Sequence, residues 1–321
     1  MLTICYFTSR KQSCIDWFSA SLARETAAHP DVKFRVVIVD FYHNFADDPL
    51  RPFSKDGWTL IAPKPTVWQG RYKLTRNDWF AASNARNTAL CLATDGWIAF
   101  VDDLSVLMPG WLTAVKEAMA GPQRTITCGA YRKVKDLVVD EKGNVVSFTD
   151  YPPGHDNRYA YGNDEGPVAC QGNWMYGCSL VAPVEAFLSI NGYPEAWCDG
   201  MGFEDVIAGI MLEKQGYRFV YDRRMMTLES EELHHQLPVM KRSDYGVSPN
   251  DKSHAVLAAA RGGNGWHPNY FGVEGLRGLR ARVLAGEPFP VVQIPQHEWY
   301  SKTPLAELDG PEPEPTESVE L

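Results

Sequence analysis

Two short apolar segments flank a helical pattern in the first forty residues. Leu2–Phe7 is apolar, a helical pattern begins near Ile15 with Ser13 as its expected N-cap, and Phe34–Asp40 (FRVVIVD) is rich in β-branched residues. A strand, a helix and a strand at this spacing are typical of a βαβ unit, in which the two strands are parallel and buried. The sequence therefore predicts an α/β fold with a mostly parallel central sheet and helices on both faces.

The alternation of helical and strand patterns continues beyond this unit. The further elements expected are helices over Ser83–Thr94, Pro109–Ala120 and Glu204–Gln215, a helix opened by Pro183, strands over Gly96–Val101, Thr125–Tyr131, Ser179–Ala182 and Tyr217–Tyr221, and a hairpin over Leu137–Phe148. Two stretches, 47–78 and 151–176, are rich in Pro, Gly and aromatic residues and are predicted to be functional loops. Beyond Glu229 we expect a small helical C-terminal region, with helices over Asp251–Arg261 and Val273–Leu284.

Composition excludes several classes of protein. The chain has 321 residues, of which 45% are hydrophobic, so it is expected to bury a core without disulfides or a structural metal. No apolar run long enough to span a membrane and no signal-peptide pattern is present, and the seven Cys include no CxxC pair; we therefore expect a cytoplasmic protein without stable membrane insertion. The net charge is −9, but six acidic residues lie between Thr303 and Leu321, so the rest of the chain is only mildly acidic.

Two adjacent carboxylates, Asp102 and Asp103, end the apolar segment GWIAFV. Ligands of open α/β sheets bind at the carboxyl ends of the strands. Two neighbouring carboxylates without a nearby Lys or Arg repel each other unless a cation is present, and Mn²⁺ or Mg²⁺ prefers oxygen ligands and could hold a diphosphate. The alternative, that one Asp caps a turn and the other faces solvent, stays open.

A second carboxylate pair, Glu204 and Asp205, follows the glycines of GMGFED and opens a predicted helix. Acidic residues are stabilised at a helix N-terminus by the macrodipole, which would account for the pair as a structural feature. That reading leaves the Gly-x-Gly segment and the nearby Trp197 unexplained. A general base beside an aromatic platform for an acceptor would account for both.

A His pair, His234 and His235, lies in the segment ESEELHHQ, about thirty residues after the second carboxylate pair. One of the two could supply a metal ligand, although a packed or surface His is the more common case.

The order of these features resembles that of family-2 type glycosyltransferases of the A-type nucleotide-sugar fold. The first similar segment is AASNARNTALCLATDGWIAFVDDLSVLMPGWL, and the second runs from GNWMYGCSL to GFEDVIAGIMLEKQGYRF, with the galactosyltransferase and chondroitin-polymerase branch most similar in its Gly-x-Gly-x-Glu-Asp segment. The N-terminal TICYFTSR and VVIVDFY are similar to the family's nucleotide-binding βαβ unit, so the resemblance covers about residues 2–236. It implies a nucleotide-sugar glycosyltransferase domain over 1–230, a C-terminal helical extension over 231–300 that completes the active site, and an acidic disordered tail over 301–321.

The resemblance also implies roles for individual residues. The implied roles are nucleotide binding for Thr8, Arg10, Asp40, Arg86, Asn87 and Asp102, metal binding for Asp103 with His234 or His235, proton removal from the acceptor by Asp205, and acceptor binding by Glu204, Trp174 and Trp197. One position departs from the family pattern, because Leu104 stands where a second metal-binding carboxylate is usual. Metal independence is therefore left open.

The function predicted from these residues is inverting transfer of a sugar from a nucleotide-sugar, expected to be a UDP-sugar, to an acceptor hydroxyl, with Mn²⁺ or Mg²⁺ as cofactor. The acceptor is either a glycan or a hydroxymethylated pyrimidine in DNA; Lys241, Arg242, Arg277, Arg280 and Arg282 could contact phosphates or form a solvated surface. Two alternatives stay open: a nucleotidyltransferase, although TSRKQS lacks the glycines of a triphosphate loop, or a catalytically inactive sugar- or nucleotide-binding protein of the same fold.

Overall fold

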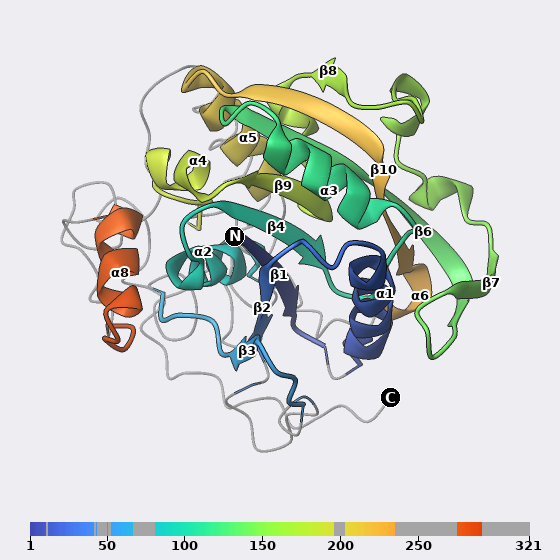
Figure 1. Ribbon diagram of the computed structural model, residues 1–321, viewed down its shortest axis with the longest axis horizontal. Helices are drawn as coiled ribbons and strands as arrows, with labels where there is room; N and C mark the ends of the chain where they lie inside the picture. Colours follow the sequence, from blue (N-terminus) through green and yellow to red (C-terminus); the bar gives the residue numbers. More distant parts are fainter. Residues whose placement is uncertain are drawn as a thin grey trace, which may run out of the picture.

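The computed structural model describes residues 1–10, 12–41, 43, 50, 53–66, 81–195, 203–234 and 275–290. The strands are β1 Leu2–Thr8, β2 Phe34–Asp40, β3 Trp58–Ile61, β4 Trp97–Asp102, β5 Ser105–Leu107, β6 Thr125–Val139, β7 Val145–Thr149, β8 Val168–Cys170, β9 Ser179–Pro183 and β10 Arg218–Ser230. The helices are α1 Ile15–Ala28, α2 Ala82–Leu92, α3 Trp111–Ala120, α4 Val184–Ser189, α5 Glu204–Lys214, α6 Glu231–His234 and α8 Gly275–Leu284, with short 3₁₀ turns at Pro152–Gly154, Tyr159–Tyr161 and Gly172–Trp174. Together they form an α/β structure around one mixed sheet (Figure 1).

The sheet has the strand order β3-β2-β1-β4-β9-β6-β10-β5, with β7 and β8 paired off this path. The first four strands are parallel to one another, and β6 and β10 are also parallel. Between these two groups lies β9, which is antiparallel to both β4 and β6. The predicted mostly parallel sheet is therefore confirmed, with β9 as an antiparallel insertion in its centre.

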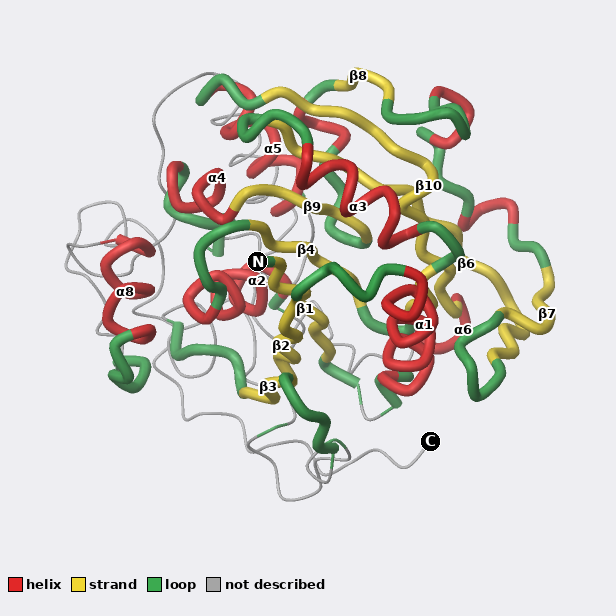
Figure 2. The backbone as a smooth tube through the Cα atoms, in the orientation of Figure 1, coloured by secondary structure: helices red, strands yellow, loops and turns green. Residues whose placement is uncertain are grey.

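Helices cover both faces of the sheet, because successive residues of each buried strand point to opposite sides. On one face, Ile4 and Tyr6 of β1 pack in a core with α1 and α3. On the other face, Cys5 and Phe7 of the same strand belong to a core with residues of α2, α4, α5 and α8. Figure 2 shows this arrangement, with the yellow strands between the red helices.

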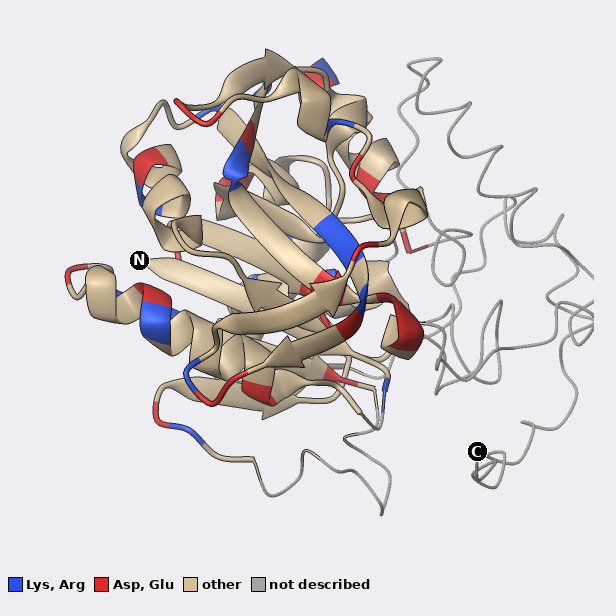
Figure 3. Cartoon of the chain, turned by 90° about the vertical axis from the view of Figure 1, so that its right-hand side faces the viewer, with Lys and Arg blue, Asp and Glu red and all other residues tan. Residues whose placement is uncertain are grey.

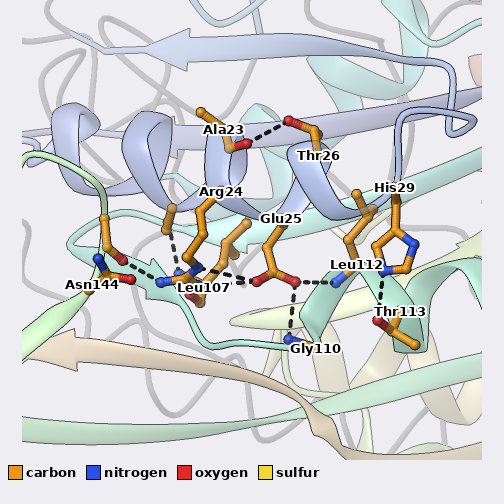
Figure 4. A network of polar contacts seen from close by, with 12 residues as sticks. Ala23, Arg24, Glu25, Thr26, His29, Leu107, Gly110, Leu112, Thr113 and Asn144 are labelled. Carbon is orange, nitrogen blue, oxygen red and sulfur yellow. Dashed lines mark hydrogen bonds and ion pairs between the residues drawn. The ribbon is translucent and has the colours of Figure 1, made fainter.

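Helix α3 receives its N-terminal cap from α1 rather than from its own sequence. Its N-cap residue is Gly110, which has no side chain to accept a hydrogen bond. The buried carboxylate of Glu25 accepts hydrogen bonds from the backbone N–H groups of Gly110 (3.2 Å) and Leu112 (3.1 Å), as Figure 4 shows. His29 at the end of α1 contacts Thr113 at 2.7 Å. These contacts hold two helices of one layer together and satisfy amide groups that the first turn of a helix leaves without partners.

Several sequence predictions differ from the structure in their bounds. The residue before α1 is Cys14, in the left-handed region at φ 52°, so the expectation that Ser13 is the N-cap is wrong. The stretch 47–78 contains the edge strand β3, since Trp58–Ile61 pairs in register with Val36–Val39 of β2. Both β6 and β10 are longer than predicted, because the whole of β10 pairs with residues 125–134 of β6 and the rest of β6 pairs with β7. The helix expected over Asp251–Arg261 lies outside the described residues.

None of the helices among the described residues is both long and apolar enough to cross a membrane.

Candidate functional site

The carboxyl ends of three neighbouring strands bring the first group of predicted site residues together. In the register of the sheet, Thr8 of β1 lies beside Asp40 of β2, and Phe7 lies beside Asp102 of β4. Thr8 and Asp40 are fully buried, and Asp103 follows directly after β4. This is the edge of the sheet at which open α/β folds bind their ligands.

Asp103 is held by the last residue of β1, Thr8, and by Arg10 from the loop that follows. Its Oδ2 atom accepts hydrogen bonds from the hydroxyl of Thr8 (2.7 Å) and from Nε of Arg10 (2.8 Å). The Arg10 guanidinium also donates to the backbone carbonyls of Leu233 (2.7 Å) and His234 (2.8 Å). Burial raises the pKa of Asp103, and Arg10 and Thr8 oppose that rise.

Asp102 has a basic partner of its own. Nη2 of Arg86 lies 3.3 Å from Asp102 Oδ1, and Nη1 lies 2.7 Å from Oε1 of Glu204. The expectation that the aspartate pair lacks a nearby Lys or Arg is therefore wrong, because Arg10 and Arg86 reach it from segments distant in the sequence. Arg86 lies in α2 and Glu204 opens α5, so this arginine joins the two predicted carboxylate pairs in one place.

Aromatic rings and a glycine confine the Arg86 side chain. Its guanidinium lies 4.9 Å from the ring centre of Phe7 and 5.1 Å from that of Tyr193. A Cβ atom on Gly177 would lie 1.7 Å from Nη2 of Arg86, so only glycine fits at this position. The cationic group is thus fixed between two aromatic faces, an arrangement that favours a desolvated guanidinium.

Asp205 stands next to this arginine at the start of α5. The preceding Phe203 adopts a left-handed backbone conformation at φ 69°, which ends the loop and begins the helix. The backbone N–H of Gly177 donates to Oδ2 of Asp205 at 3.0 Å. Burial raises the pKa of Asp205 to about 7, the neighbouring Glu204 adds to this rise, and Arg86 opposes it. A carboxylate with such a pKa is suited to accept a proton near neutral pH.

A further acidic residue, Glu229, lies beside these two carboxylate pairs and was not named as a site residue from the sequence. It is buried near the end of β10, where its neighbour in the register is Lys133 of β6. Burial raises the pKa of Glu229 to about 8, Lys133 opposes that rise, and Asp102 and Asp103 add to it. The only sequence signal was the acidic run ESEE, but finding Glu229 required the pairing of β6 with β10.

Asp103 and His234, the two predicted metal ligands that the structure describes, each have another partner. Asp103 already contacts a cation, Arg10, and Nε2 of His234 lies 3.0 Å from Nζ of Lys133. Because an ammonium only donates hydrogen bonds, that imidazole nitrogen is the acceptor and its lone pair is used. Within the described ranges, no group of three or more His, Cys, Asp and Glu residues is placed to hold a metal ion. The described members of the set therefore do not fit a divalent cation, while His235 lies outside the described residues.

Two residues with predicted binding roles have structural partners. Asn87 donates to the carbonyl of Tyr193 (2.9 Å) and to Glu195 (2.8 Å), and thereby holds the segment that precedes residue 196 against α2. Trp174 packs edge-on between Tyr161 and Tyr221. Trp197 lies outside the described residues, so its role in acceptor binding stays a prediction.

Two tyrosines, rather than Trp174, present aromatic rings next to the site. Tyr131 and Tyr176 are half-buried, with ring centres 6.3 Å apart. The guanidinium of Arg158 lies 4.1 Å from the Tyr176 ring, and Tyr176 immediately precedes Gly177. Nothing in the sequence distinguished these two tyrosines from the other aromatic residues of the chain.

The basic residues considered for phosphate contact are engaged elsewhere. Arg277 pairs with Glu185 at 2.6 Å, and Arg282 pairs with Glu287 at 2.8 Å. Arg280 donates to the carbonyl of Ala93 and contacts Asp95. Lys241 and Arg242 lie outside the described residues. Figure 3 shows charged residues on strands, helices and loops alike. The three arginines of α8 contact other residues of the protein.

A cavity of about 550 Å³ lies away from these residues. It is lined by α3, β8 and the first residues of β6 and β10, including Ala118, Thr125 and Cys170. These are the amino ends of β6 and β10, whereas Lys133 lies further along β6 and Glu229 lies near the carboxyl end of β10. The cavity is therefore separate from the site.

Comparisons with known proteins relate this architecture to one family. Residues 54–183 match the family described as Glycosyl transferase family 2. The comparison with curated proteins found no match to this sequence. Among solved structures, the chain is similar to GalNAc-T7 with UDP, GalNAc and Mn²⁺ (TM-score 0.55, 10% identity) and to S. aureus TarS 1-349 in complex with UDP-GlcNAc (TM-score 0.51, 14% identity). Each similarity covers 81% of this chain, but only 48% and 66% of those chains respectively, and it shows a common A-type fold.

Proposed function

We propose that the protein transfers a sugar from a UDP-sugar to an acceptor hydroxyl, as the match of residues 54–183 to the family described as Glycosyl transferase family 2 suggests. The observation that carries this proposal is the position of Arg86, which contacts Asp102 at the end of β4 and Glu204 at the start of α5. The carboxylates predicted for the donor and those predicted for the acceptor thus lie on either side of one guanidinium. The two solved structures named above contain UDP or UDP-GlcNAc, which supports uridine as the donor nucleotide.

The proposed reaction is a single displacement with inversion at the anomeric carbon. The acceptor hydroxyl gives its proton to Asp205 while its oxygen attacks the anomeric carbon from the face opposite the diphosphate. The hydrogen bond from Gly177 fixes the orientation of the Asp205 carboxylate, and the raised pKa makes it a better proton acceptor than an ordinary aspartate. Glu204 is not free to do the same, because Arg86 holds it.

The acceptor that the described residues favour is a glycan rather than DNA. The arginines of α8 that could contact phosphates have carboxylate or carbonyl partners within the protein. Tyr131 and Tyr176 offer half-buried aromatic rings beside Gly177, and sugar rings bind to such surfaces through their apolar faces. Dependence on Mn²⁺ or Mg²⁺ stays a prediction, and no step of the mechanism above uses a metal.

The test is an assay of UDP release from UDP-sugars, with and without an acceptor panel of oligosaccharides and hydroxymethylated DNA. We expect UDP release that depends on an oligosaccharide, and a product whose anomeric configuration by NMR is opposite to that of the donor. A product that retains the anomeric configuration of the donor would contradict the single-displacement mechanism. Release of pyrophosphate from a nucleoside triphosphate would instead favour a nucleotidyltransferase, and nucleotide binding without any turnover would favour an inactive binding protein.

A titration with salt separates the two acceptor classes. Each phosphate contact with a DNA acceptor releases counterions on binding, so its affinity falls steeply as the salt concentration rises. Binding of a neutral oligosaccharide lacks this dependence. A steep loss of acceptor affinity between low and physiological salt would overturn the preference for a glycan.

A further inference from the structure

Lys133 is a half-buried cation at the centre of the acidic site. It lies in β6, on the same side of the strand as Tyr131, two residues away. Its ammonium group donates to Nε2 of His234 at 3.0 Å. In the part of the chain that the structure describes, no carboxylate oxygen lies within ion-pair distance of Lys133.

Two carboxylates nevertheless lie close enough to be affected by its charge. Glu229 is the register neighbour of Lys133 across the parallel β6–β10 pair, which places their side chains side by side. Burial raises the pKa of both Glu229 and Asp102, and the positive charge of Lys133 opposes that rise. Lys133 therefore lies between the end of β4 and the end of β10, near both acids without being bound to either.

The other buried cations of the site are already neutralised. Arg10 is 4% exposed and paired with Asp103, and Arg86 is 2% exposed and paired with Asp102 and Glu204. Both arginines therefore act within the framework that holds the carboxylates. Lys133 differs from them because, among the described residues, its ammonium group donates to an imidazole nitrogen of His234 and to no carboxylate, which leaves two ammonium protons for a ligand.

We propose that Lys133 contacts the diphosphate of the bound UDP-sugar and balances the negative charge that develops on it as the sugar leaves. This inference rests on the proposed function and names a further catalytic residue for it. In the step concerned, the acceptor oxygen bonds to the anomeric carbon, the bond from that carbon to the diphosphate oxygen breaks, and its electron pair stays on that oxygen. The acceptor proton goes to Asp205, and Lys133 remains protonated throughout.

In this way Lys133 supplies the positive charge that was expected, from the sequence, to come from a divalent cation. The described donor set is arranged for this substitution, because Asp103 binds a guanidinium, His234 accepts from an ammonium and Leu104 carries no ligand atom. A fixed cation beside a leaving group stabilises the charge of the transition state in the same manner as a metal ion. Because it is already in position, no further rearrangement of the protein is needed during the reaction.

The experiment compares the binding of UDP and uridine to the full chain in the presence of EDTA, by calorimetry. Wild-type protein is expected to bind UDP at least about tenfold more tightly than uridine, a preference of about 1.4 kcal/mol that comes from the diphosphate. Lys133→Met keeps the aliphatic stem and removes the charge, so it is expected to abolish this preference while uridine binding is retained. Lys133→Arg is expected to restore it. The matched control is Lys135→Met, an exposed lysine of the same strand that lies over Tyr151.

The outcomes separate this inference from the proposed function. Retained uridine binding with an unchanged preference for UDP in Lys133→Met would overturn the inference alone. The same holds if wild-type protein prefers UDP only after Mn²⁺ is added. If wild-type protein binds neither UDP nor uridine, the proposed function itself fails, and the role of Lys133 fails with it. Retained uridine binding also shows that the Lys133→Met variant is folded.

Discussion

Arg86 of α2 and Glu204 of α5 form a buried ion pair, with 2.7 Å between Nη1 and Oε1. The two residues are more than a hundred positions apart in the sequence. Because Arg86 also contacts Asp102, the pair fixes the start of α5 relative to the carboxyl end of β4. The position of Asp205, the next residue of α5, depends on this contact.

Loss of this arginine should destabilise the whole fold. Arg86→Met leaves Glu204 buried without its partner, and we expect the free energy of unfolding to fall by about 3–5 kcal/mol. Urea denaturation measures the change. Arg277→Met, which breaks the exposed pair with Glu185, is the control and should change the free energy of unfolding by about 0.5 kcal/mol or less. Similar effects of the two substitutions would show that the buried pair contributes little.

Adding a methyl group at residue 177 should lower the rate of transfer without changing the charge of the protein. In Gly177→Ala the new Cβ atom meets the Arg86 guanidinium, which must move away from Asp102 and Glu204. A displacement of about 1 Å at a reacting group is expected to lower kcat by about 100-fold. Gly166→Ala is the matched control, because no atom lies within 4 Å of the Cβ position there. Normal turnover of the Gly177→Ala protein would argue against a fixed position for Arg86.

Proton transfer to Asp205 should appear in the dependence of the rate on pH. The carboxyl accepts a proton only when ionised, so kcat is expected to rise as the pH increases through about 7, the raised pKa of this group. In Asp205→Asn we expect transfer to fall by about 10²–10⁴-fold, with nucleotide-sugar binding nearly intact. Initial rates from pH 5 to 9 and calorimetric titration with UDP-sugar measure these effects. A loss of binding as large as the loss of transfer would remove Asp205 from the role of base.

Loss of the cap that α1 supplies to α3 should lower the free energy of unfolding and leave ligand binding unchanged. Glu25→Ala removes the acceptor of two amide hydrogen bonds, and the free energy of unfolding is expected to fall by about 2 kcal/mol. Glu185→Ala, at an exposed carboxylate, is the control for loss of a negative charge. Binding of UDP should be unaffected at temperatures well below the unfolding transition, because Glu25 touches none of the site residues. A stability equal to that of wild type would show that water replaces the cap.

The sequence predicted the fold well wherever the pattern was local. Phe34–Asp40 became β2 with the same bounds, because a run of β-branched residues ended by an acidic residue specifies a buried strand without help from the rest of the chain. The hairpin of β6 and β7 was predicted from its turn residues for the same reason. The strand that ends in Asp102 was predicted to within a residue at each end.

Partners distant in the sequence could not be predicted in this way. Arg10 and Arg86 pair with Asp103 and Asp102, and these pairings were not predicted, since a charge buried during folding needs a counter-charge from whichever segment packs against it. Lys133 was missed because the predicted strand stopped at Tyr131, and its neighbours are set by the pairing of β6 with β10. The roles assigned to individual site residues stay predictions that the experiments above address.

The antiparallel insertion of β9 has a consequence for how the chain matures on the ribosome. Strands β1 to β4 pair with one another and are complete once residue 102 has been synthesised. Strand β6 joins them only through β9, which is made much later. We therefore expect nascent chains that end before residue 179 to resist protease in strands β1, β2 and β4, while the segment of β6 is still cleaved.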